Sequence, residues 1–147
     1  MAYSSIPAAK AQLLTTLQAR PGLVDVLIEW GIPMEQPANR ERVYVDDAVN
    51  VTRDWAQIGQ FTIDEEYTLH IHVEVFQEGD DRRVCEERMW AIVAEVEQAA
   101  VLDITLAGVL KWGAKPGPMD PKCFPYADGW MSNVMLNLEC GARLRAT

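Results

Sequence analysis

Two histidines and a glutamate form the best candidate for a chemical site in this sequence. His70, His72 and Glu74 alternate along a segment of extended pattern, so a strand would place all three side chains on one face of a sheet. Two imidazoles and a carboxylate at that spacing can bind one metal ion. The simpler interpretation is a polar sheet face, solvated or packed against a neighbouring subunit, because the chain offers no further ligand motif. We therefore predict no metal-binding residues.

Other catalytic arrangements have little support in the sequence. Phosphate-binding loops of the G-x-G-x-x-G and G-x-x-x-x-G-K-S/T types do not occur. A nucleophilic site needs an imidazole beside a Ser or Cys, and both histidines belong to one predicted strand. Paired acids such as Asp46-Asp47, Asp64-Glu65-Glu66 and Asp80-Asp81 fit helix starts and strand flanks at least as well as a hydrolase pair. We expect a protein that is not an enzyme.

Composition narrows the class of protein further. A chain of 147 residues with 49% hydrophobic content fits a single domain over residues 1–147. Its three cysteines lack a C-x-x-C spacing, which indicates reduced thiols in a cytosolic setting. The formal charge of −9 disfavours specific nucleic-acid binding. We also expect no secretion signal and no membrane span, because no stretch approaches the ~20 apolar residues that would cross a bilayer.

The apolar periodicity predicts an α+β domain with the element order α-β-β-β-α-β-β. The first helix covers 6–20, and the second is capped by Asp80 and ends near Ala100. The predicted strands cover 23–30, 42–46 with 48–52, 64–77, 109–114 and 130–144. Strand-to-strand steps without crossover helices favour a largely antiparallel sheet of four to five strands, with both helices packed on one face.

Two stretches without clear periodicity carry the candidate contact residues. The composition of residues 53–61 indicates a loop or a short helical turn. Residues 113–129 contain four prolines, and we predict a long loop there. Large aromatics in such segments are favoured at protein interfaces, although the longer loop could equally fold back on its own core. The predicted subunit-interface residues are Asp54, Trp55, Trp112, Lys122, Phe124 and Tyr126.

Several short phrases, taken together, resemble a known family. They are Val43-Tyr-Val-Asp46 followed by Arg53-Asp-Trp55, then Glu65-Glu-Tyr67, Glu86-Glu-Arg88 and Cys140-x-Ala-Arg-Leu144. With the initial helix, this pattern resembles the small tail terminator, or tail completion, proteins of long non-contractile-tailed bacteriophages, over nearly the whole chain.

The resemblance implies a virion protein at the head-tail junction, present in the host cytoplasm during assembly. Its subunits would close into a hexameric ring that caps the tail tube, stops tube polymerisation and joins the tail to the head. Its partners would be further copies of itself, the tail tube protein and the head-tail connector protein. The resemblance implies no cofactor.

Three rival interpretations stay open at this level. Another neck component, such as a stopper or head completion protein, is the nearest, and a β-barrel core would favour it over the terminator. A small metal-dependent enzyme would use His70, His72 and Glu74. A ligand-binding domain would require a deep apolar pocket.

Overall fold

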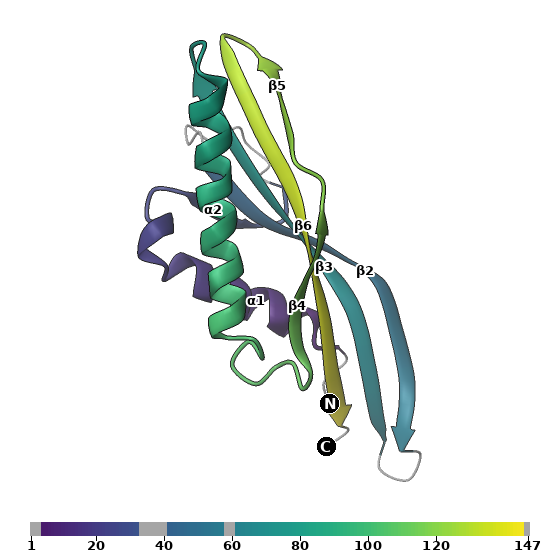
Figure 1. Cartoon of the computed structure of the whole chain (residues 1–147). Coiled ribbons are helices and arrows are strands. Elements are labelled where there is room, and N and C mark those ends of the chain that lie inside the picture. The colour runs from purple at the N-terminus through teal and green to yellow at the C-terminus, as the bar shows by residue number, and fades with distance from the viewer. Residues whose placement is uncertain (1–3, 33–40, 58–60, 146–147) are drawn as a thin grey trace.

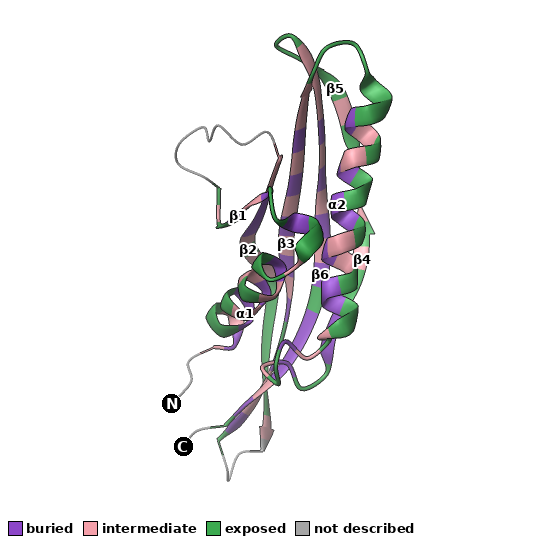
Figure 2. Cartoon of the chain, turned by 90° about the vertical axis from the view of Figure 1, so that its left-hand side faces the viewer, coloured by how far each residue is buried: buried purple, intermediate pink, exposed green. Residues whose placement is uncertain are grey.

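Two helices lie on one face of a long, twisted sheet (Figures 1 and 2). The computed structural model describes residues 4–32, 41–57 and 61–145. The helices are α1 (Ile6–Gln18) and α2 (Arg82–Leu102), with a short 3-10 helix at Pro21–Leu23. The strands are β1 (Leu27–Trp30), β2 (Glu41–Gln57), β3 (Thr62–Glu78), β4 (Gly113–Met119), β5 (Lys122–Tyr126) and β6 (Gly129–Arg145).

The sheet is antiparallel except at one edge. Its strand order is β1-β2-β3-β6-β4, with β5 also paired to β6, and only β1 and β2 run parallel among the pairs of the described chain. At the centre, β3 and β6 pair without a register shift from Thr62 opposite Arg145 to Glu78 opposite Gly129. The predicted α+β class, largely antiparallel sheet and element order are confirmed.

The core lies between this sheet and the two helices. The predicted alternation in β3 is confirmed, because Leu69 and Ile71 are fully buried beneath the helices while their neighbours face the other side. Ile92 of α2 and Leu13 of α1 pack into the same core. Burying each such side chain contributes about 1.5–3 kcal/mol to folding.

The segment from 113 to 129 is not a long loop. It forms β4 and β5, so the described residues make six strands where four to five were expected. Proline lacks a backbone N–H, but it is tolerated in edge strands because one side of each strand needs no partner. The prolines at 116, 118 and 125 therefore did not prevent strand pairing. The predicted loop was wrong for this reason.

Three predicted boundaries also differ from the structure. Pro21 starts a 3-10 helix, so the first strand begins at Leu27 and not at Leu23. The α2 cap is Asp81 and not Asp80, since the Asp81 carboxylate accepts the Val84 N–H at 3.1 Å. The strand predicted from 109 starts at Gly113, because residues 106–108 all have positive φ and turn the chain.

Candidate subunit-contact surfaces

One candidate surface is the end of the β2–β3 hairpin, which extends beyond the helices (Figure 1). We call residues 50–57 and 61–66 the hairpin arm. Residues 53–57, ambiguous in sequence, continue β2 and pair with β3. Trp55 and Phe61 are each 62% exposed, and their rings meet edge to face with centroids 6.4 Å apart. An exposed aromatic pair on a projecting hairpin is a surface that a protein partner can bury.

A buried carboxylate fixes the base of the hairpin arm to α1. Glu65 is only 1% exposed, and it accepts hydrogen bonds from the Ser5 backbone N–H at 2.9 Å and the Ser5 hydroxyl at 2.7 Å. The Ser4 hydroxyl also donates to it, and Arg53 Nε lies 3.2 Å from its second oxygen. A negative charge at a helix N-terminus is favoured by the helix dipole. The arm is therefore held firmly against the body.

On the other side of the arm, two cations lie close to the ring of Trp112. The Arg143 guanidinium lies 5.3 Å from the Trp112 ring centroid and the Lys111 ammonium 5.0 Å from it. Arg143 is itself fixed by Asp64 through bonds of 2.6 and 2.8 Å, and this bonding lowers the pKa of the Asp64 carboxyl. Trp112 remains 51% exposed, so it is positioned without being buried.

The second candidate surface lies at the opposite end of the sheet, along β5. The register places Phe124 opposite Met131 and Tyr126 opposite Gly129, on the face of the sheet that α2 does not cover. Tyr126 meets Phe76 edge to face at 5.9 Å, and both Phe124 and Tyr126 are exposed. We call Phe76, Phe124, Tyr126 and Met131 the β5 patch.

The structure places all six predicted interface residues on the surface but does not gather them into one site. Asp54 and Trp55 lie on the hairpin arm, and Trp112 lies near the base of that arm. Lys122, Phe124 and Tyr126 lie on β5 at the far end of the sheet (Figure 1). Sequence reasoning did not select Phe61, because the flanking segment showed no strand period. Whether any of these residues contacts a partner stays a prediction.

The histidine strand forms a set of internal contacts. His72 stacks on Tyr44 with ring centroids 4.7 Å apart, and its Nε2 lies 3.3 Å from an Asp46 carboxylate oxygen. Glu74 is bound by Arg42 and accepts the Tyr44 hydroxyl at 3.1 Å. Burial lowers the pKa of His72. Burial and the nearby Glu74 charge raise the pKa of Tyr44 to about 12.

These contacts occupy the side chains that a metal site would need. Glu74 already has two donors, and His72 is fixed by its stacking with Tyr44. Across the described ranges, no group of three or more His, Cys, Asp or Glu side chains is close enough to hold a metal ion. The arrangement fits the polar sheet face that the sequence favoured. Sequence reasoning did not connect Tyr44 and Asp46 with the histidines. The signal that could have done so is their alternation in Val43-Tyr-Val-Asp46, which places both side chains on one face of the strand that pairs with the histidine strand.

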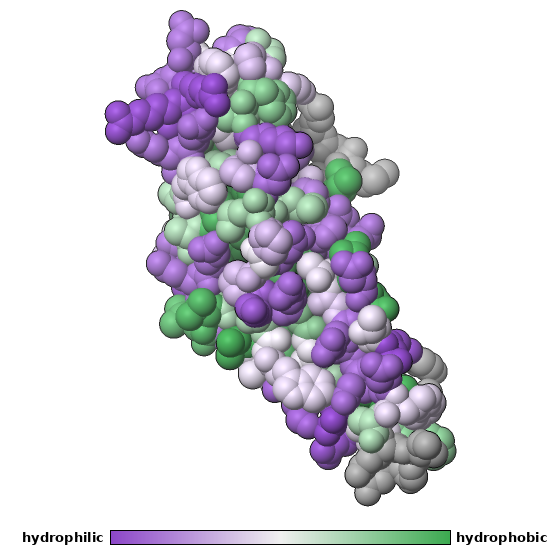
Figure 3. All heavy atoms as spheres, turned by 45° about the vertical axis from the view of Figure 1, so that its right-hand side comes forward, coloured by the Kyte–Doolittle hydropathy of each residue, from purple (hydrophilic) through white to green (hydrophobic). Residues whose placement is uncertain are grey.

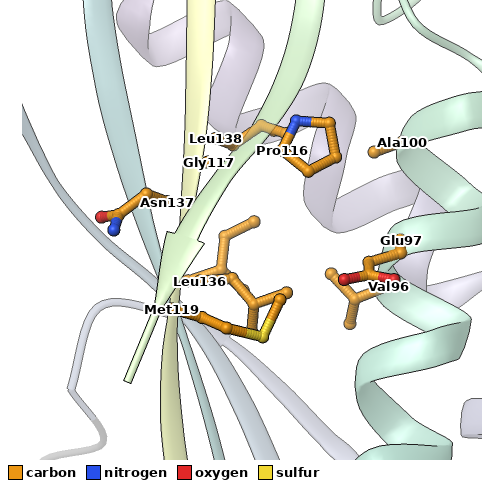
Figure 4. A pocket seen from close by; sticks show the side chains of 10 residues that line it. Val96, Glu97, Ala100, Pro116, Gly117, Met119, Leu136, Asn137 and Leu138 are labelled. Atoms are coloured by element: carbon orange, nitrogen blue, oxygen red, sulfur yellow. The ribbon is translucent and has the colours of Figure 1, made fainter. Parts of the chain in front are cut away.

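Three hollows lined by described residues are either small or wide open. An apolar recess between α2 and β4 is lined by Val96, Ala100, Met119 and Leu136, and it has space for about one water molecule (Figure 4). Two other hollows, one beside Trp112 and one along residues 23–28, are shallow and open to solvent. Within the described residues, these hollows offer no deep apolar pocket of the kind a ligand-binding domain needs.

The surface is mixed in character. A view that brings the helix-free side of the sheet forward shows hydrophilic residues interspersed with separate hydrophobic patches on the face turned to the viewer (Figure 3). No helix among the described residues is long and apolar enough to cross a membrane.

Comparison with known proteins gives a likeness of fold. No protein-family model and no curated protein sequence matches the chain. Among solved structures, a chain of the virion of a native gene transfer agent (GTA) particle superposes with a TM-score of 0.67 at 15% sequence identity. The superposition covers 97% of this chain and 100% of the other, so the two chains share one fold over their whole length.

Proposed function

We propose that this protein is a structural virion subunit that forms a ring on the tail tube of a phage-like particle. The ring would stop tube polymerisation and join the tail to the head connector. The observation that carries the proposal is the full-length likeness of fold to a chain from a gene transfer agent virion. The resemblance of the sequence to tail terminator proteins supports the same role.

The distribution of exposed aromatics supports ring formation. A closed ring of identical subunits uses a heterologous contact, in which one patch meets a different patch on the next copy. The hairpin arm and the β5 patch lie at opposite ends of the sheet, and both present exposed aromatic side chains (Figure 1). We infer that the arm of one subunit packs on the β5 end of its neighbour, with the head connector and tail tube proteins on the two rims.

The acidic charge suits a ring around a channel. With 13 basic and 22 acidic residues, a channel wall made by this chain would repel passing DNA and would not bind it specifically. This role needs neither a cofactor nor a substrate, so the protein would not be an enzyme.

A stopper or head completion protein remains the second candidate. The observation that bears on this choice is the open sheet with two helices on one face, which favours the terminator over a β-barrel stopper. A decisive test is to polymerise the tail tube protein of the same particle with and without this protein, and to measure tube lengths by electron microscopy. A terminator limits tube length by capping one end, whereas a stopper leaves the lengths unchanged.

Ring formation is tested first by light scattering and native mass spectrometry over a range of concentrations and salt. We expect a hexamer of the 16.5-kDa chain, or a monomer that becomes one when concentrated. Trp55→Ala and Phe124→Ala, on the two proposed patches, should each abolish it. Trp90→Ala is the matched control, because Trp90 is 44% exposed on α2, away from both patches. Rings that survive both patch substitutions would contradict the proposed contact.

A further inference from the structure

Two of the three cysteines lie where the first turn of α2 packs on the sheet. Cys85 Sγ donates to the backbone oxygens of Val75 at 3.5 Å and Trp130 at 3.4 Å, on the central strands β3 and β6. Cys123 of β5 lies directly opposite Ser132 of β6, which is in turn opposite Val75. Both side chains therefore lie on the helix-covered face of the sheet near Ser132. Burial, with a smaller contribution from the neighbouring Cys123, raises the pKa of the Cys85 thiol.

The surroundings of the two sulfurs differ in a way that suits disulfide exchange. Cys123 is partly exposed, so a small disulfide in solution can reach its sulfur. Cys85 is fully buried, and burial raises the pKa of its thiol. Ser132, opposite Cys123 in the sheet, is buried, and its hydroxyl has no hydrogen-bond partner within the described part of the chain.

We propose that Cys85 and Cys123 form an intramolecular disulfide when the protein meets a low-molecular-weight disulfide such as oxidised glutathione. The Cys123 thiolate attacks one glutathione sulfur, which breaks the S–S bond and releases one reduced glutathione. The Cys85 thiol then loses its proton and attacks the Cys123 sulfur of the mixed disulfide, which releases the second glutathione. Two protein thiols are oxidised, and one glutathione disulfide is reduced to two thiols.

The disulfide would attach the edge strand β5 to the start of α2. In the reducing cytosol the pair stays as thiols, and it closes after transfer to an oxidising medium. Cys140 takes no part, because it is buried on β6 near the other end of the sheet and burial raises the pKa of its thiol to about 12. The inference does not depend on the proposed ring, since it concerns contacts inside one subunit.

The test is to incubate the purified full-length protein with excess oxidised glutathione and to measure its intact mass and its cysteine linkage by peptide mapping. We expect a loss of about 2 Da, the mass of two hydrogens, with Cys85 linked to Cys123. The melting temperature should rise by on the order of 5–10 °C, because the disulfide closes a loop of nearly 40 residues in the unfolded chain.

Variants separate this chemistry from general oxidation. Cys85→Ala should stop at a stable glutathione adduct on Cys123, since the second thiol is missing. Cys123→Ala should gain neither an adduct nor a disulfide, whereas Cys140→Ala should behave as the wild type. The proposal would be overturned by a wild-type protein that keeps three thiols, retains a glutathione adduct on Cys123, or forms disulfide-linked dimers.

Discussion

The middle of the sheet and the hairpin arm share the strands β2 and β3 but are stabilised in different ways. In the middle, Leu69 and Ile71 are buried beneath α1 and α2, so apolar burial dominates. In the arm, the fixed points are polar, namely buried Glu65 and the Asp64–Arg143 pair, while Trp55 stays exposed. Polar anchoring can hold a projecting strand pair in place and still leave its aromatic residues available to a partner.

The largest expected effect is in the covered middle. Leu69→Ala should lower the free energy of unfolding by about 2–5 kcal/mol, because it removes buried contacts and leaves a cavity. Urea denaturation followed by circular dichroism measures the change. The control is Thr68→Ala, one residue away on the opposite face, which should change stability by less than about 0.5 kcal/mol. Equal losses for the two variants would mean that the two faces do not differ as described.

The next largest effect should come from the polar anchor of the arm. Glu65→Ala leaves the Ser5 N–H, two serine hydroxyls and Arg53 without their shared acceptor, at a cost of about 2–4 kcal/mol. Hydrogen exchange should show faster opening at the start of α1 and in the arm than in α2. Glu66→Ala, at the exposed neighbouring position, is the control and should change neither measurement.

A smaller effect should be a pH dependence of the free energy of unfolding, caused by His72 on the helix-free face of the sheet. The folded-state pKa of His72 lies below its ordinary value of 6.5, so the unfolded chain binds more protons below that pH. Stability should therefore be constant above pH 6.5 and fall as the pH drops from 6.5 toward the folded pKa. Thermal melts between pH 8 and 5 measure this, and His72→Gln should flatten the curve. The control is His70→Gln, and a curve that flattens only there would contradict the assignment.

The smallest change in stability is expected for Trp55→Ala. Its side chain is mostly exposed, so its loss should shift the free energy of unfolding by less than about 0.5 kcal/mol. The same variant should nonetheless fail to form rings. A clear loss of stability in the isolated subunit would show that Trp55 serves the arm itself and is not held ready for a partner.

The sequence predicted the helix-covered middle of the sheet well, because elements that bury one face carry apolar residues at a regular spacing. Alternation in β3 and β6 and the stripe of α2 each follow from one buried face. The end of β2 and the strands β4 and β5 lack that signal, because they lie at the edges or beyond the helices. These segments are extended because they pair with β3 and β6. Such pairing between distant segments cannot be predicted from the local sequence, which is rich in proline and glycine in β4.

The exposure of the candidate contact residues could be predicted from the sequence, but their positions in the sheet could not. Exposure of Trp55, Phe124 and Tyr126 follows from their irregular or polar neighbourhoods. Their separation to opposite ends of the sheet depends on strand order, which no local pattern encodes. The setting of Trp112 likewise depends on Arg143, which reaches it only through the pairing of β6 in the sheet.

The central pairing of β3 with β6 also sets the timing of folding. Its partners are at least about 50 residues apart in the chain, so much loop-closure entropy is lost before these contacts form. The β2–β3 hairpin, whose partners are close in sequence, can form early and would then expose one long unpaired strand edge. Until β6 has been synthesised and inserted, that edge is open to other chains, so aggregation competes with folding during this interval.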